Sequence, residues 1–179
     1  MRMTSGNPVP SAARPLTTVA LRDGRRVLLR PLLPTDRDAL ATAFERLSDE
    51  SQLLRFGAVP HTLSAARLHH LVDSVDQVNH IAFAAFAEAD PERLVGVGRI
   101  LRYPDDPDSL DVGLTVADDY QAIGLGHVLV NLLAAHRPKP SRRVLTQIAT
   151  GNDRAMALLS GFGTPQRIDD GQIVIDFPA

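Results

Sequence analysis

Gln121, Gly124 and Gly126 form the pattern Q-x-x-G-x-G within the stretch DDYQAIGLGHVLVNLLAAH. A strand-like alternating run precedes the pattern, and an amphipathic run that predicts a helix over 124–136 follows it. Glycine costs about 0.5–1 kcal/mol relative to alanine inside regular structure, so two glycines at this junction indicate that the backbone itself has a task there. The free N–H groups and the positive dipole end of a first helical turn can bind a phosphate.

The pattern differs from two other phosphate-binding fingerprints. The dinucleotide motif G-x-G-x-x-G would need a glycine at position 129, where the chain has Leu129, and an acidic residue about 20 positions further on. A P-loop needs a lysine directly after its last glycine, and Lys139 lies far from the motif. On its own, Q-x-x-G-x-G equally fits a tight turn that lets a helix and a strand pack closely.

Asp111 is a second candidate for chemistry, in the alternating stretch SLDVGLTVA at 109–117. Asp111, Gly113 and Thr115 share one face of the predicted strand, where small residues leave room for a ligand. The other face is apolar and carries Leu110, Val112, Leu114 and Val116. A carboxylate beside a ligand can accept a proton as a general base, whereas a solvated strand carboxylate would have no such role.

The sequence predicts no metal site. His69 and His70 are neighbours on a predicted helix and point about 100° apart, unlike the i, i+4 histidines that chelate one ion. The chain has no cysteine, which excludes disulfides, thiol catalysis and cysteine-ligated metals. His127 falls in the first turn of the predicted helix 124–136, where it either packs on the helix face or approaches a ligand.

The composition fits one soluble domain. The 179 residues are 44% hydrophobic, which is enough for a sizeable core, and no run of about 18 apolar residues predicts a membrane span. A net charge of −2 and 4% aromatic residues argue against nucleic acid as a partner. The N-terminus lacks the apolar segment of a secretory signal, so we expect a cytoplasmic location.

The elements that would position these residues begin after a predicted flexible tail. Residues 1–16 are rich in Pro, Ser and Gly without periodicity, and 17–179 are expected to form a single domain. Two β-rich runs flank Asp23-Gly24 and predict a hairpin with a type I′ turn. Helical patterns follow at 35–47 after a Thr35 cap, at 48–57 and at 62–75.

Strands and helices alternate in the rest of the chain. Strands predicted at 80–87, 93–102 and 109–117 form an antiparallel meander. They are followed by helix 124–136, strand 142–150, helix 152–162 and a last strand at 171–177. The fold class that this order predicts is α/β, with one mixed sheet and helices on both faces.

These stretches together resemble the GNAT superfamily of acyl-CoA-dependent N-acetyltransferases. Within it the chain resembles the acetyltransferase domain of bacterial protein-lysine acetyltransferases, through LRDGRRVLLRPLLPTDRDAL, FERLSDESQLLRFG, LSAARLHHLVDSVDQVNHIAF, LVGVGRI and VADDYQAIGLG. The resemblance covers nearly the whole chain after the tail. It implies the GNAT fold, whose central twisted mixed sheet has about six or seven strands. That sheet splays between its fourth and fifth strands, here 109–117 and 143–150.

The resemblance also implies how acetyl-CoA, the co-substrate, would bind. The CoA pyrophosphate would be held by the backbone amides of Gln121, Ala122, Ile123, Gly124, Leu125 and Gly126. The main chain of Leu114 and Val116 would pair with the pantetheine arm and hold the oxyanion. Asn152 heads the family pattern N-x-x-A-x-x-L-x-x-x-x-G and would contact the pantetheine. Asp111 matches a glutamate of the resembling enzymes, which makes it the candidate catalytic base.

Three positions depart from the family's pattern. Ile123 stands where the superfamily usually has Arg or Lys, so one phosphate-facing charge is lost unless Arg154 or another arginine replaces it. Leu159 stands where many members carry the tyrosine thought to protonate the leaving thiolate. Thr164 replaces an aromatic residue, which concerns packing.

Two functions remain open at this point. The first is an N-acetyltransferase that moves acetyl from acetyl-CoA directly to a primary amine, on a protein lysine or on a small molecule. The second, suggested by Ile123 and Leu159, is a catalytically weak or inactive acyl-CoA-binding regulatory module. The expected partners are acetyl-CoA and an amine acceptor, without nucleic acid or membrane, and the chain is expected to be a monomer or a homodimer.

Overall fold

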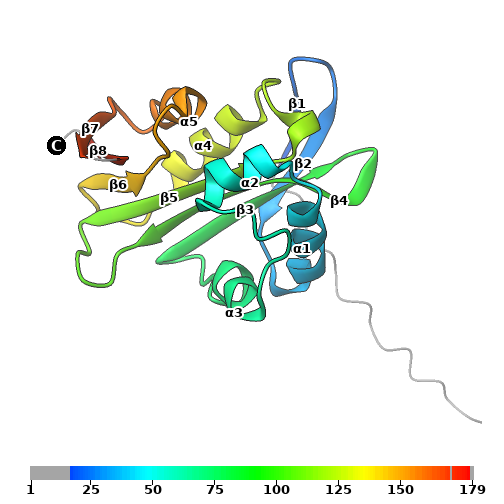
Figure 1. The fold of residues 1–179 in the computed structure, drawn as a ribbon, viewed down its shortest axis with the longest axis horizontal. Coiled ribbons are helices and arrows are strands. Elements are labelled where there is room, and N and C mark those ends of the chain that lie inside the picture. Colours follow the sequence, from blue (N-terminus) through cyan, green and yellow to red (C-terminus); the bar gives the residue numbers. More distant parts are fainter. Residues whose placement is uncertain (1–16, 170, 178–179) are drawn as a thin grey trace, which may run out of the picture.

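The computed structural model describes residues 17–169 and 171–177, and the tail expected at 1–16 lies outside them. A twisted sheet separates two groups of helices (Figure 1). The strands are β1 Thr17–Ala20, β2 Arg26–Pro31, β3 His80–Ala87, β4 Asp90–Arg102, β5 Ser109–Val116, β6 Arg143–Gln147, β7 Gln166–Asp169 and β8 Gln172–Asp176. The helices are α1 Arg37–Glu45, α2 Asp49–Phe56, α3 Ala65–Leu68, α4 Leu125–His136 and α5 Asp153–Leu159.

The predicted mixed sheet is confirmed, with eight strands in the described residues instead of six or seven. The spatial order is β1-β2-β3-β4-β5-β6-β8-β7, and only the β5–β6 pair is parallel. The strand that the sequence did not predict is β7, an edge strand with the sequence QRID. All four of its residues are exposed, so it has no buried face and no apolar alternation to reveal it.

The hairpin of β1 and β2 forms where it was predicted, but its turn is not type I′. Gly24 has φ +89°, whereas Asp23 is not among the residues with positive φ. Gly24 N donates to Leu21 O at 3.0 Å, and Leu21 N donates to Arg25 O at 2.7 Å. This three-residue loop places its one left-handed residue at a glycine, as in a type I turn followed by a bulge.

Thr35 does not cap the first helix. The segment starts with a 3₁₀ turn over Pro34–Asp36, and α1 follows it. The carboxylate of Asp36 accepts from Leu33 N at 2.8 Å and from both terminal nitrogens of Arg30 at 2.6 and 2.7 Å. A buried carboxylate paired with an arginine therefore organises this turn, instead of a threonine hydroxyl.

The third predicted helix, 62–75, is divided. Ser64 caps α3 by accepting from Arg67 N at 3.2 Å, and a π-helical turn, His69–Asp73, continues from α3. Leu71 and Val72 of that turn are buried against the sheet.

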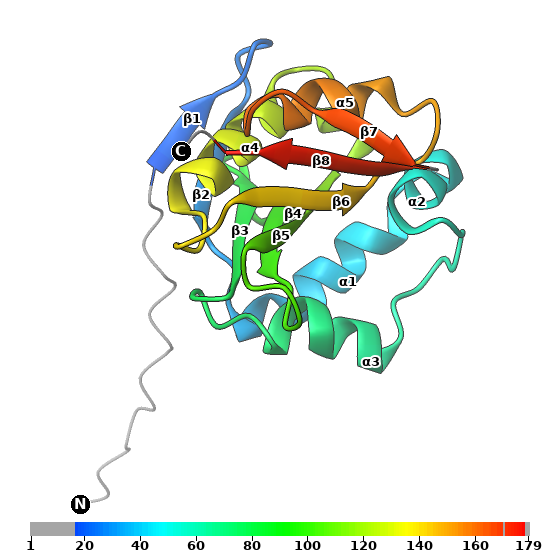
Figure 2. The ribbon, with the colours of Figure 1, turned by 90° about the vertical axis from the view of Figure 1, so that its left-hand side faces the viewer.

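Each face of the sheet has its own core. Figure 2 shows α4 and α5 on one side of the strands and α1 and α3 on the other. In β3, Phe83 and Ala85 pack in the cluster with α4, while Ala82 and Ala84 pack in the cluster with α1. No helix within 17–169 and 171–177 is long and apolar enough to cross a membrane.

Candidate functional site

The predicted splay lies between β5 and β6. These strands pair only at Ser109 with Arg143 and at Leu110 with Val144. Beyond these pairs the strands separate, and a cleft of about 410 Å³ opens between them. Ligand pockets of small-molecule sites typically measure about 300–1,000 Å³, so this cleft has the size of a cofactor site. Residues of α2, of the segment before α4 and of α5 complete its walls.

The unpaired edge of β5 presents backbone groups to the cleft. Ala117 N donates to Val95 O of β4, so the odd-numbered residues of β5 turn their backbone groups toward β4. The even-numbered residues, including Leu114 and Val116, therefore turn theirs toward the gap. Thr146 Oγ1 already donates to Val112 O at 3.2 Å, and Gln121 Nε2 donates to Val116 O at 3.2 Å.

The start of α4 lies at one end of the cleft. Gly124 is its N-cap with φ +102°, and no described side chain caps this helix. Ala122, also in the left-handed region at φ +60°, lines the cleft together with Gln121, Gly124 and Gly126. An uncapped first turn leaves backbone N–H groups available to an anion.

Ile123 and Leu125 could contact a ligand in the cleft only through their backbone groups. Leu125 is fully buried, and Ile123 packs against the same core cluster. Neither side chain lines the cleft. The two glycines serve different purposes, because Gly124 needs its positive φ, whereas a Cβ on Gly126 would lie 3.0 Å from Leu158. Close packing of α4 against α5 therefore accounts for part of the glycine pattern.

Two arginines lie near the segment that leads into α4, where Ile123 supplies no charge. Arg22, from the loop between β1 and β2, brings its Nε within 3.7 Å of the position a Cβ on Gly124 would take. Arg22 N also donates to Ile123 O at 3.0 Å. Arg154, which the sequence suggested, lines the cleft and lies 3.4 Å from Gln121 Oε1. Arg22 was missed because it is distant in sequence and carries no motif.

The opposite wall of the cleft comes from α5. Asn152 lines it and caps α5, with Oδ1 accepting from Ala155 N at 3.1 Å. Leu159 also lines it and is only 6% exposed, so this wall presents an apolar group without a proton to donate. His127, exposed in the first turn of α4, completes the lining near the glycines.

Asp111 lies beside the cleft, not in its lining. Its Oδ1 accepts from Thr146 Oγ1 at 2.7 Å, and Thr146 itself lines the cleft. The predicted space on this face of β5 is not empty, because a Cβ on Gly113 would come within 2.3 Å of Arg55 Nη2. The glycine thus makes room for an arginine of α2, which sequence reasoning missed.

The two arginines on this face, Arg55 and Arg99, are electrostatically coupled to Asp111. Burial lowers the pKa of Arg55, the charge of Asp111 opposes that shift, and Arg67 adds to it. Burial also lowers the pKa of Arg99 to about 9, with Arg55 adding to the shift and Asp111 opposing it. Within the described ranges, no cluster of three His, Asp or Glu side chains could hold a metal ion.

The sequence of residues 26–164 matches the family described as Acetyltransferase (GNAT) domain. Acetyltransferase PA5475 of Pseudomonas aeruginosa is 33% identical over 160 residues, which cover 87% of this chain and 85% of that protein.

Two solved structures show the same fold. The GNAT domain of S. lividans PAT is 27% identical with a TM-score of 0.78, over 90% of this chain and 95% of that one. The aminoglycoside acetyltransferase AAC(6')-Ib, solved with coenzyme A, is 17% identical with a TM-score of 0.61, over 84% of this chain and 94% of that one.

Proposed function

The chain belongs to the acetyltransferase (GNAT) family, and we propose that it moves the acetyl group of acetyl-CoA directly to a primary amine of a protein lysine or a small molecule. The observation that carries this proposal is the cleft at the splay. It offers unpaired strand backbone along β5 and the uncapped start of α4 at its end. An amide-rich thioester arm with a pyrophosphate at its far end matches both features.

In this arrangement the pyrophosphate lies at the backbone amides of Gln121 to Gly126, and Arg22 and Arg154 supply positive charge beside it. The pantetheine arm extends along β5 and hydrogen bonds to the main chain of Leu114 and Val116. Asn152 contacts the arm from α5. The binding energy then comes mostly from backbone groups, which the protein fold holds in place before the ligand arrives.

The acceptor must lose a proton to react. An amine with pKa about 10.4 is neutral in about one molecule in 10³–10⁴ at pH 7, and only the neutral form attacks the thioester. The amine nitrogen bonds to the carbonyl carbon, and a backbone N–H near Leu114 to Val116 holds the oxyanion. Asp111, oriented by Thr146, takes the amine proton through a bridging water.

The intermediate collapses by breaking the carbon–sulfur bond. CoA leaves as a thiolate, which is a stable anion because thiols have pKa values near 8.5. Leu159 offers no proton at this point, so the thiolate takes its proton from solvent.

Thiol release from acetyl-CoA, measured with and without a panel of primary amines, tests the proposal. Amine-dependent release supports it. Calorimetric binding of acetyl-CoA without release for any amine would instead indicate an acyl-CoA-binding regulatory module, and heat with NAD but none with CoA would reject both.

A further inference from the structure

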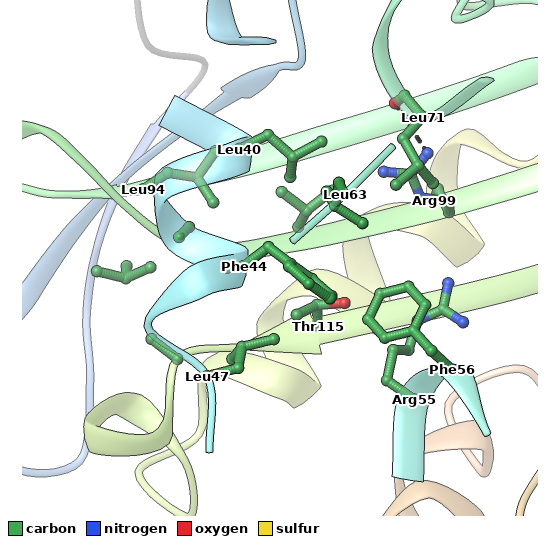
Figure 3. Close-up of a pocket in the computed structure, with 15 residues that line it drawn as sticks. Leu40, Phe44, Leu47, Arg55, Phe56, Leu63, Leu71, Leu94, Arg99 and Thr115 are labelled. Atoms are coloured by element: carbon green, nitrogen blue, oxygen red, sulfur yellow. Dashed lines mark hydrogen bonds between the residues drawn. The ribbon is translucent and has the colours of Figure 1, made fainter. Parts of the chain in front are cut away.

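A second, smaller cavity lies under α1 and α2 next to the cleft, with which it shares Leu47, Arg55 and Thr115. It measures about 30 Å³, which is room for a group of a few atoms. Apolar side chains form most of its wall, and two guanidinium groups lie at one end of it (Figure 3). The labelled apolar residues are Leu40, Phe44, Leu47, Phe56, Leu63, Leu71 and Leu94.

Arg55 connects this cavity with the cleft, since it lines both. Its side chain crosses Gly113 in the middle of β5, and its guanidinium carbon lies 5.0 Å from the centre of the Phe56 ring. Arg55 Nε is buried and has no hydrogen-bond partner among the described residues. A buried donor without a partner costs about 1–3 kcal/mol, more when the group is charged, so it needs an acceptor that the chain does not supply.

Arg99 approaches Gly113 from β4. It is 9% exposed, and its Cγ would lie 3.3 Å from a Cβ on Gly113. One terminal nitrogen donates to Leu71 O at 2.9 Å and lies 3.4 Å from His80 Nε2. Burial, the charge of Arg99 and that of His70 lower the pKa of His80 to about 4, so His80 is neutral at pH 7 and adds no charge of its own.

The charges at this end of the cavity do not balance. Arg55 and Arg99 are two cations, and Asp111 is the one carboxylate coupled to both. Neither guanidinium lies within 4.0 Å of a carboxylate oxygen in the part of the chain that the structure describes. A buried side chain stays charged when an opposite charge pairs with it. A planar guanidinium group pairs with a carboxylate through two parallel hydrogen bonds.

We propose that the amine acceptor also carries a carboxylate, which Arg55 and Arg99 bind while its amine faces the thioester beside Gly113. The proposal rests on the acetyl transfer proposed above and names the acceptor class, an amino acid or a peptide with an acidic group near its amine. Polycationic acceptors are disfavoured, because the same two arginines repel them.

The first test compares acceptors that differ only in this charge. L-Amino acids, 4-aminobutyrate and their primary amides form matched pairs, and lysine peptides flanked by Glu or by Gln form another. We expect the carboxylates to be preferred about 10- to 150-fold in kcat/KM, the range of one charged hydrogen bond. α-Amidation lowers the pKa of the amine and enlarges its neutral fraction, so for the α-amino acids this control works against the expected preference.

The second test removes the positive charge of Arg55. Arg55→Leu should abolish the preference for carboxylates over their amides, measured as the ratio of the two kcat/KM values, and Arg55→Lys should restore part of that preference. Arg67→Leu is the matched control, because Arg67 also lies over Phe56, at 5.4 Å, but is exposed on α3. Binding of butyrate, which has no amine, should protect the wild type against heat and not Arg55→Leu.

The outcomes separate the two proposals. Equal rates for acids and amides in the wild type overturn the carboxylate site and leave acetyl transfer intact. A preference that survives Arg55→Leu also overturns it. Absence of thiol release with every acceptor overturns the proposed function itself. If Arg55→Leu does not fold, the wild-type comparison of acids with amides still decides.

Discussion

The cleft and the small cavity next to it differ in the groups that they offer to a ligand. In the proposed binding mode, the cleft offers main-chain N–H and C=O groups of β5 and of the start of α4 to acetyl-CoA. The small cavity offers the side chains of Arg55 and Arg99, which come from α2 and β4 and are both coupled to Asp111 of β5. Backbone recognition needs glycines and a turn at fixed spacing, whereas side-chain recognition depends on residues that only the fold brings together.

This difference predicts that chemistry and cofactor binding respond to different substitutions. Asp111→Asn should lower kcat/KM by about 10²–10⁴-fold, the usual contribution of a general base, and leave acetyl-CoA affinity nearly unchanged. The loss should shrink as the pH approaches the pKa of the acceptor amine, because a larger neutral fraction needs less help. Steady-state kinetics over pH 7–10 and calorimetry of acetyl-CoA check both.

Asp111→Glu is the matched variant and should retain activity. Equal activity and stability in Asp111→Asn would remove this residue from the site. A loss that ignores pH and comes with a lower melting temperature would make its role structural.

The stability of the protein at acid pH should depend on His80, which lies beside Arg99. The pKa of His80 falls to about 4 in the folded protein, so folding favours the neutral ring. His80 adds no penalty above pH 6.5, where it is neutral in both states. Below that, the unfolded chain takes up a proton that the folded one rejects, which costs up to about 3 kcal/mol by pH 4.

Melting curves between pH 7.5 and 4 measure this effect. His80→Gln should reduce the fall in melting temperature at acid pH. His70→Gln changes an exposed ring whose centre lies 5.6 Å from that of His80, and it should reduce this fall less. An unchanged slope in His80→Gln would assign the acid sensitivity to other groups.

Gly124→Val should show whether acetyl-CoA affinity depends on the backbone conformation at the start of α4. A β-branched residue at φ +102° is strained, and the turn that presents the amides shifts to relieve it. We expect acetyl-CoA affinity to fall about 10- to 150-fold, as for one lost charged hydrogen bond. Gly57→Val is the control, since Gly57 has φ +70°, lies after α2 and does not line the cleft.

Both glycine variants should lose similar stability, and only Gly124→Val should lose affinity in calorimetry. Unchanged affinity in Gly124→Val would leave the glycine pattern explained by helix packing alone.

Arg22→Gln should have the smallest effect. Arg22 is exposed, so its contribution to binding of the phosphates is screened and worth about 0.2–1 kcal/mol, less than about sixfold in affinity. The effect should vanish at high salt. A larger, salt-independent loss would contradict the assignment of a screened charge to Arg22.

The parts of the molecule that follow local rules were predictable from the sequence. Alternation and helical periodicity located the meander, α4 and β8, and the glycine pattern located the start of α4. Two interpretations that went wrong concern pairings that the periodic pattern of the sequence does not show. Arg30 pairs with Asp36 and moves the helix start away from Thr35, and pairing with β8 makes a strand of QRID.

The candidate site divides along the same line. The alternation of the strand predicted which face the side chains of Leu114 and Val116 share, whereas their role toward acetyl-CoA came from the family resemblance and stays a prediction. The room predicted for a ligand beside Gly113 is occupied by Arg55, which is 58 positions away in the sequence on a helix whose place no pattern in the sequence reveals. A small residue in a strand therefore predicts space next to it but does not predict which group fills that space.

The separation of β5 from β6 has a consequence for the lifetime of the protein. A sheet with an open seam lacks main-chain pairings there, and acetyl-CoA bound along β5 would supply them. A ligand at 100 times its dissociation constant stabilises the folded state by about 2.7 kcal/mol. The fraction of unfolded chains exposed to proteolysis would then fall about a hundredfold when acetyl-CoA is abundant, which links the abundance of the enzyme to the supply of its own co-substrate.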